Sequence, residues 1–84
     1  MPAIAIPDVL RRYSGGEARL VVRGSTAREA LEALPAALRE RVLDEQGRLQ
    51  PYLVLVLDGA RVESLDRALA PGDRLEILAA AGGG

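Results

Sequence analysis

The chain has no cysteine, no histidine and no lysine, and these absences exclude most kinds of reactive site. Without cysteine there is no disulfide framework and no thiolate ligand for a metal ion. Without histidine or lysine, Ser14, Ser25 and Ser64 lack an ordinary base that would activate them as nucleophiles. A metal site would need carboxylates alone, so we expect none. The sequence therefore does not predict an enzyme with a catalytic site of its own.

Aromatic residues are few, and the chain has almost no net charge. There is no Phe or Trp, and the formal net charge is −1. Nucleic acids and anionic membranes are usually bound by clustered basic surface, so neither partner is expected. No apolar run approaches the roughly 18 residues of a membrane span. The N-terminal residues do not resemble a secretion signal, and we expect a cytoplasmic protein.

What the chain does contain is typical of one small folded domain. Apolar residues make up 49% of its 84 residues and charged residues 27%. Four segments have the composition of strands: 3–7, 17–23, 52–59 and 74–78. Residues 8–13 fit one helical turn, and "SGG" at 14–16 supplies a tight turn, so the first two strands are expected to form a β-hairpin. The nearly continuous apolar run "YLVLVLDG" at 52–59 is expected to be the central strand.

One amphipathic helix is predicted after the hairpin. Thr26 is positioned to cap it, with Glu29 reaching back to the Thr26 amide as a capping box. Pro35 should break or kink the helix and open a second short one. Apolar residues recur at spacings of three and four, which places them on one face of the helix; they are Ala27, Leu31, Leu34, Leu38 and Val42.

The order of elements favours an α+β fold of the β-grasp, ubiquitin-like type. In this fold a mixed sheet curls around one main helix, and the last strand lies beside the first. We expect a single domain over 1–84 with a C-terminal tail at 79–84. Residues 61–63 are expected to return beside the strand at 52–59, and 64–69 to form a helical turn. The alternative, a ferredoxin-like split βαβ, needs a second long helix in 60–73, a segment too short and too broken by Pro71 and Gly72.

The tail is the most informative segment for function. It reads Ala79-Ala80-Ala81-Gly82-Gly83-Gly84 and carries no large side chain. Such a tail can pass through a narrow channel, and glycine leaves its carbonyl carbon sterically open to attack.

Several segments together resemble a known family. They are "IPDVLRRYSGG", "GSTAREALEAL", "LVLVLDGARV", "LAPGDRLEIL" and the terminal glycines. In order and spacing the chain resembles the small β-grasp sulfur carriers of the ThiS/MoaD type: the thiamine-biosynthesis carrier, the molybdopterin-synthase small subunit and, most closely, the carrier of mycobacterial-type cysteine biosynthesis.

The resemblance implies a carrier rather than an enzyme. An E1-like adenylyltransferase and sulfurtransferase, using ATP, would adenylate the C-terminal glycine, here Gly84, and the acyl-adenylate would become a thiocarboxylate. Gly82 and Gly83 would thread the channels of that enzyme and of a sulfur-accepting synthase. No cofactor bound to the carrier itself is implied.

Two departures from the family pattern leave alternatives open. The family usually ends in two glycines, so either Gly84 reacts at the end of a lengthened tail or it is trimmed to expose Gly83. Molybdopterin-synthase subunits usually carry Phe and Pro before the glycines, whereas this chain has "ILAAA". A cysteine synthase-like acceptor is therefore favoured over the molybdopterin-synthase large subunit. A ubiquitin-like modifier or simple binding module is the third hypothesis.

A partner also needs a face on which to dock. Strand alternation predicts an apolar patch on the sheet side away from the helix, formed by Val54, Val56, Val62 and Leu78. A register shift of one residue would expose Leu53, Leu55 and Leu57 instead. Arginines around the rim are expected to steer binding.

Overall fold

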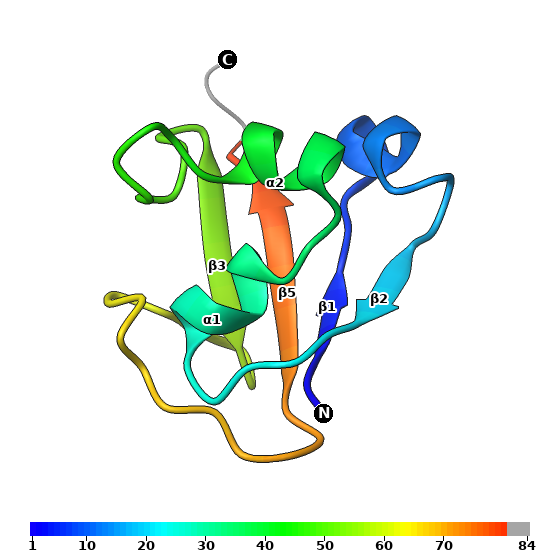
Figure 1. Cartoon of the computed structure of the whole chain (residues 1–84). Helices are drawn as coiled ribbons and strands as arrows, with labels where there is room; N and C mark the ends of the chain where they lie inside the picture. The colour runs from blue at the N-terminus through cyan, green and yellow to red at the C-terminus, as the bar shows by residue number, and fades with distance from the viewer. Residues whose placement is uncertain (81–84) are drawn as a thin grey trace.

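The computed structural model describes residues 1–80 and forms one mixed sheet with helices on one face (Figure 1). Its elements, in chain order, are β1 (Ala3–Ala5), the 3-10 helix η1 (Asp8–Tyr13), β2 (Arg19–Val21), α1 (Ala27–Glu32), α2 (Ala36–Val42), β3 (Leu53–Leu57), β4 (Ala60–Arg61) and β5 (Arg74–Ala79). The spatial order of the strands is β2-β1-β5-β3-β4. Strands β1 and β5 are parallel, and the other neighbours are antiparallel.

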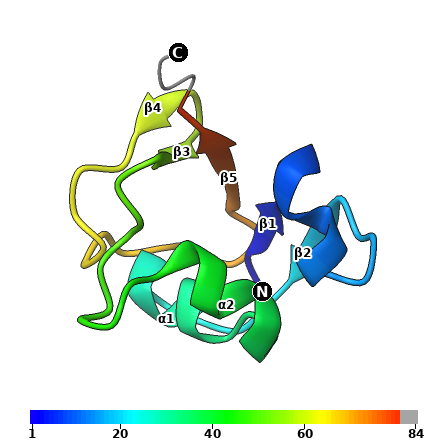
Figure 2. The ribbon, with the colours of Figure 1, turned by 90° about the horizontal axis from the view of Figure 1, so that it is seen from above.

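This arrangement confirms the predicted α+β, β-grasp class. The last strand lies beside the first, and the sheet curves around α1 and α2 when seen from above (Figure 2). The prediction that residues 52–59 form the central strand was wrong: β5 is central, and β3 lies next to it. The long apolar run misled the prediction because the inner face of β3 is as buried as that of a central strand. Only the two-residue β4 lies beyond β3 in the sheet.

The core lies between the sheet and the two α-helices. Leu75 and Ile77 of β5 are each 1% exposed, and Leu53, Leu55 and Leu57 of β3 are also buried. The predicted strand register is therefore correct, and the shifted alternative is excluded. The helical stripe of Ala27, Leu31, Leu34, Leu38 and Val42 is buried throughout, as its spacing predicted.

The predicted main helix is divided in two at Pro35. Helix α1 ends at Glu32, and Pro35 is the residue before the first turn of α2. Proline has no amide hydrogen and clashes with a preceding helical turn, so the division falls where the sequence indicated. The fold thus has two short helices, the second of which begins after Pro35 as the sequence predicted.

The start of α1 contains most of the predicted capping box. The Thr26 hydroxyl accepts a hydrogen bond from the Glu29 amide at 3.1 Å. The Glu29 carboxylate, however, accepts from the amide and hydroxyl of Ser25, both at 2.8 Å, one residue earlier than predicted. These donors stabilise the ionised form and lower the pKa of Glu29, with the Ser25 amide the largest contribution.

The predicted helical turn at 64–69 is present as a single turn that covers only the first part of this range. The amide of Arg67 bonds to the carbonyl of Ser64 at 3.1 Å, which closes a single turn. The chain then runs antiparallel to the residues that open α1: the Ala27 amide bonds to the Arg67 carbonyl, and the Leu69 amide bonds to the Ser25 carbonyl, both at 2.9 Å. These long-range bonds replace the local ones that a helix would make. Over residues 1–80, no helix has the length and apolar character needed to cross a bilayer.

The first prediction concerns Gly24, which packs directly against α1. Its φ is +150°, and an added Cβ would lie 2.6 Å from the Ala30 backbone nitrogen. Because neither backbone can move without displacing the helix, Gly24→Ala should lower the free energy of unfolding by about 3 kcal/mol. Gly72→Ala is the control: its φ is +86°, but no atom lies within 4 Å of the added Cβ. It should cost only about 1 kcal/mol of backbone strain. Urea denaturation of both variants would test this, and equal losses would contradict the close approach.

The second prediction concerns the pH dependence of stability. The folded pKa of Glu29 is lowered, so its contribution is fully present above the unfolded value and is lost as pH falls through the folded value. Glu29→Gln should therefore reduce the acid-induced loss of stability below about pH 4.5. Thermal unfolding from neutral to acid pH would measure it. Parallel curves for wild type and variant would show that the cap does not depend on ionisation.

Candidate functional site

The base of the tail is the end of the central strand. Strand β5 pairs with β1 on one side and with β3 on the other, up to the pair of Ala79 with Leu53. One further bond, from the Ala80 amide to the Tyr52 carbonyl at 2.7 Å, extends the β3 pairing to the last described residue. Main-chain hydrogen bonds therefore fix the point where the tail leaves the domain. The predicted tail residues Gly82, Gly83 and Gly84 lie outside the described residues.

Three of the four predicted patch residues lie together on the uncovered face of the sheet. Val54 pairs across strands with Leu78, which is 41% exposed. Val56 follows two residues after Val54 on the same side, and both valines are partly exposed. Because directly paired residues point to the same face, these side chains form one apolar strip, which we call the outer patch. It lies beside the base of the tail.

Val62 does not belong to the outer patch, and that prediction was wrong. It is only 7% exposed and is part of the core. The pair of Val56 with Arg61 places Val62 opposite Leu55, and its amide bonds to the Leu55 carbonyl at 2.8 Å. Opposite residues share a face, so Val62 points inward with Leu55.

Charged residues border the outer patch in an ordered row. The strand pairings place five residues side by side across the sheet: Arg19, Ala5, Glu76, Val56 and Arg61. One carboxylate therefore lies near the middle of the outer face, and an arginine lies at each edge. Arg61, which pairs with Val56, lies at the rim of the outer patch, where the sequence predicted arginines without naming them, whereas Arg19 lies two strands from β5. Val21 of β2, 63% exposed, extends the apolar surface of the same face and was not predicted.

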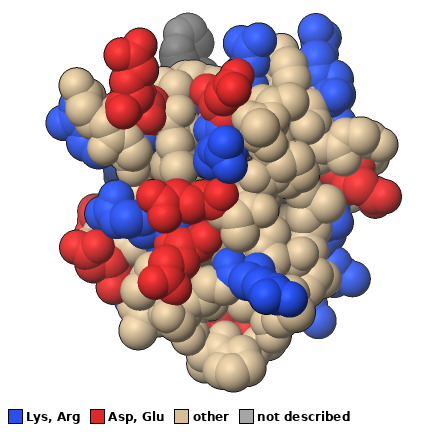
Figure 3. Space-filling view, in the orientation of Figure 1, with Lys and Arg blue, Asp and Glu red and all other residues tan. Residues whose placement is uncertain are grey.

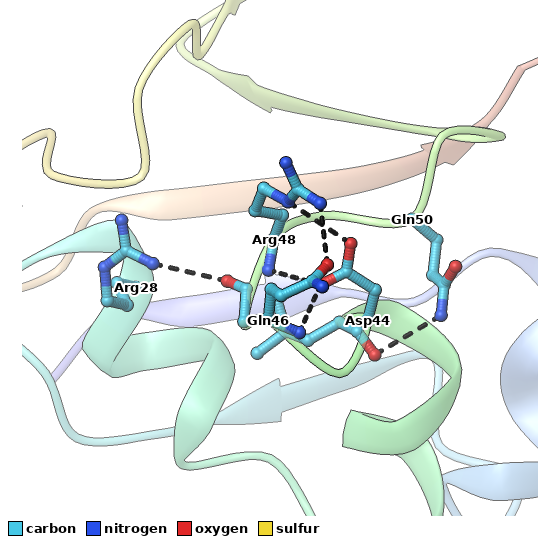
Figure 4. Close-up of polar contacts among 7 residues, drawn as sticks. Arg28, Asp44, Gln46, Arg48 and Gln50 are labelled. Carbon is cyan, nitrogen blue, oxygen red and sulfur yellow. Dashed lines mark hydrogen bonds and ion pairs between the residues drawn. The ribbon is translucent and has the colours of Figure 1, made fainter.

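Asp44, in the loop after α2, serves the fold. Figure 4 shows the loop around Asp44, whose carboxylate accepts from the Gln46 amide at 2.8 Å and the Arg48 amide at 2.9 Å. These bonds lower the pKa of Asp44, with the Arg48 amide as the main cause. Arg28 ties the same loop to α1 through the Gly47 carbonyl. Within residues 1–80 no three carboxylates are grouped as metal ligands would be.

Sequence reasoning missed an aromatic and basic cluster at the tail end of the molecule. The guanidinium carbons of Arg41 and Arg12 lie 4.6 Å and 5.9 Å from the centroid of the Tyr13 ring. The Tyr52 hydroxyl donates to the Arg41 carbonyl at 3.1 Å. Residues 13 and 41 are far apart in the sequence and meet only because α2 packs against η1, so no local pattern could have revealed the cluster.

Comparison with solved structures finds the same fold in proteins of two kinds. CysO of Mycobacterium tuberculosis is 27% identical, with a TM-score of 0.85 over 96% of this chain and 100% of that one. CysO in the BexX/CysO complex of Amycolatopsis orientalis is also 27% identical, with a TM-score of 0.88 and full coverage of both chains. The small archaeal modifier protein SAMP1 of Haloferax volcanii is 27% identical, with a TM-score of 0.77 over 99% of this chain and 98% of that one.

Comparison with curated protein sequences finds no significant match. The ThiS family model, in contrast, matches residues 4–84, which is nearly the whole chain and includes the terminal glycines. The chain therefore belongs to the ThiS family.

Proposed function

We propose that this protein is a sulfur carrier whose Gly84 carboxylate is adenylated and then converted to a thiocarboxylate. The match of the ThiS family through the terminal glycines carries the proposal, and the similarity to CysO supports a role in cysteine biosynthesis. The alternative is that the chain is the small subunit of a molybdopterin synthase, whose large subunit would then receive the tail.

The proposed chemistry needs nothing from the carrier except its terminal carboxylate. A carboxylate oxygen attacks the α-phosphorus of ATP and pyrophosphate leaves, which turns a poor electrophile into an acyl-adenylate. A sulfur nucleophile then attacks the carbonyl carbon and AMP leaves, so that the terminal oxygen is replaced by sulfur. ATP and the reactive groups belong to the E1-like partner, consistent with a chain that has no histidine, cysteine or lysine.

The anchored base of the tail sets its reach. Ala80 is fixed by its bond to Tyr52, and four residues follow it. Four extended residues span at most about 14 Å. A partner must therefore approach closely to bring its reactive centre to Gly84. In this proposal the outer patch of Val54, Val56 and Leu78 is the docking surface that brings the partner to that distance.

A second function, protein modification, is favoured by one specific observation. The chain is as similar in sequence to SAMP1 as it is to CysO, at 27% identity in both cases. A modifier and a sulfur carrier can share the first step, adenylation of the terminal glycine. They differ in the attacking group, which is a substrate amine in one case and sulfur in the other.

The third prediction tests the carrier function. Incubation with ATP, the cognate E1-like enzyme and a sulfur source should increase the intact mass by one oxygen-to-sulfur exchange, and fragmentation should place it at Gly84. A variant lacking Gly83 and Gly84 should show no mass change, because the terminal carboxylate of the shortened tail would not reach the partner's reactive centre. Isopeptide adducts on lysines of other proteins, without a thiocarboxylate, would support the modifier function. An unchanged mass together with the absence of adducts, with a demonstrably active enzyme, would refute both.

The fourth prediction tests the outer patch. Leu78→Asp should lower kcat/KM for adenylation about tenfold, because a charge is introduced at the centre of the contact and must be desolvated on docking. Val21→Asp is the matched control: Val21 is exposed on the same face, but β2 is separated from β5 by β1. The control should change kcat/KM less than about twofold. Equal effects would show that the face responds to charge as a whole and that the patch is not the contact.

A further inference from the structure

The cluster of Arg12, Tyr13 and Arg41 lies at the same end of the molecule as the base of the tail. Strands β1 and β5 are parallel neighbours, so η1, which follows β1, and the tail, which follows β5, leave the sheet at one end. Figure 1 shows η1 and α2 at that end. The cluster is tied to the base of the tail through Tyr52, whose hydroxyl bonds to Arg41 and whose carbonyl bonds to Ala80.

The two arginines of the cluster have no acidic partner in the described structure. Over residues 1–80, ion pairs are made by Arg11, Arg28 and Arg48, but not by Arg12 or Arg41. Neither guanidinium group donates a side-chain hydrogen bond within this range, and both residues are exposed. Two like charges are thus held beside one ring with their donors unbonded within residues 1–80. Figure 3 shows basic side chains along the upper right edge, over η1 and α2.

The Tyr13 ring restricts the motion of both side chains. An arginine within about 6 Å of a tyrosine ring is attracted to its face, and the flat guanidinium keeps its in-plane donors available. Tyr13 is only partly exposed and packs against the core, so the ring is a fixed support. Arginines held in this way lose less rotamer freedom on binding a carboxylate than mobile surface arginines do.

From this geometry we infer that Arg12 and Arg41 form a second docking site, which binds carboxylates on the protein that receives the tail. The inference rests on the proposed function, because it takes the tail as the segment delivered to the partner. The partner chemistry is acidic because two unpaired cations converge on one side of the tail base. The site differs from the outer patch in position, since it is built from η1 and α2 on the helix side, and in character, since it is basic rather than apolar.

The decisive variant is the double charge reversal R12E/R41E. Its matched control is R23E/R67E, which makes the same change in net charge at two exposed arginines that also lack ion pairs over residues 1–80. Arg23 follows β2, which runs opposite to β1, and the Arg67 carbonyl bonds to the first residue of α1. Both control residues therefore lie at the end of the molecule remote from the tail. Thermal unfolding would first establish that both variants fold like the wild type.

With the cognate E1-like enzyme, R12E/R41E should lower kcat/KM for adenylation about tenfold, while R23E/R67E should lower it less than about twofold. The difference should shrink as salt rises from about 0.1 M to about 1 M, because exposed charges are then screened. A normally active wild type with equal effects of the two double variants would overturn the docking site and leave the carrier function intact.

A second measurement does not depend on activation. Amide resonances of the labelled protein would be followed during titration with a hexaglutamate peptide. Shifts should be largest at Arg12, Tyr13, Arg41 and Tyr52 and should disappear in R12E/R41E. Such shifts in a protein that is never adenylated would retain the basic docking site and reject the carrier function. Shifts spread evenly over all exposed arginines would overturn the site whatever the activity.

Discussion

The structure depends on the position of its last strand. Strand β5 lies at the centre of the sheet, bonded to β1 on one side and to β3 on the other, and its inner side chains Leu75 and Ile77 are almost fully buried. A C-terminal strand in this position cannot separate from the sheet without loss of both ladders and much of the core. The main chain is therefore held up to Ala80, and the segment after it starts from a fixed point. For a protein proposed to act through its terminal carboxylate, this constraint connects folding to function directly.

The parts of the fold that repeat a strict period could be predicted from sequence. The alternation in 53–57 and 74–78 assigns inner and outer faces, because a side-chain period of two allows only two registers and one of them would expose leucines. The spacing of the helical stripe and the break at Pro35 were predictable for similar reasons. Val62 was misassigned because it lies just beyond β4, where no alternating run indicates a face. The orientation of Val62 follows from the pairing of Arg61 with Val56, which is a contact between strands that the local sequence does not indicate.

The candidate site divides in the same way. The outer patch is local to two strands, so Val54, Val56 and Leu78 could be found from alternation once the strands were recognised. The arginine cluster is not local, since its ring comes from η1 and one of its arginines from α2. All eleven basic residues in this sequence are arginines, so the sequence offers no way to single out two of them as a pair. Only the packing of α2 against η1 places Arg41 over the Tyr13 ring, which distinguishes it from the other arginines that make no ion pair within residues 1–80.

The two proposed docking surfaces suit the proposed function, in which the protein passes from one partner to another. The outer patch is small, with one exposed leucine and two partly exposed valines, and β5 adds Glu76 and Arg74 beside it. Interfaces of this kind bury little apolar area, so they do not produce the long residence times of obligate complexes. Charges at the edge act mainly on the rate and orientation of encounter, while the buried contact governs dissociation. In the proposed function, a basic pair on the helix side and a small apolar strip on the sheet side would orient the tail from two directions without binding so tightly that release becomes slow. Because one tail cannot occupy two channels, the proposed activating and accepting proteins would use these surfaces in turn.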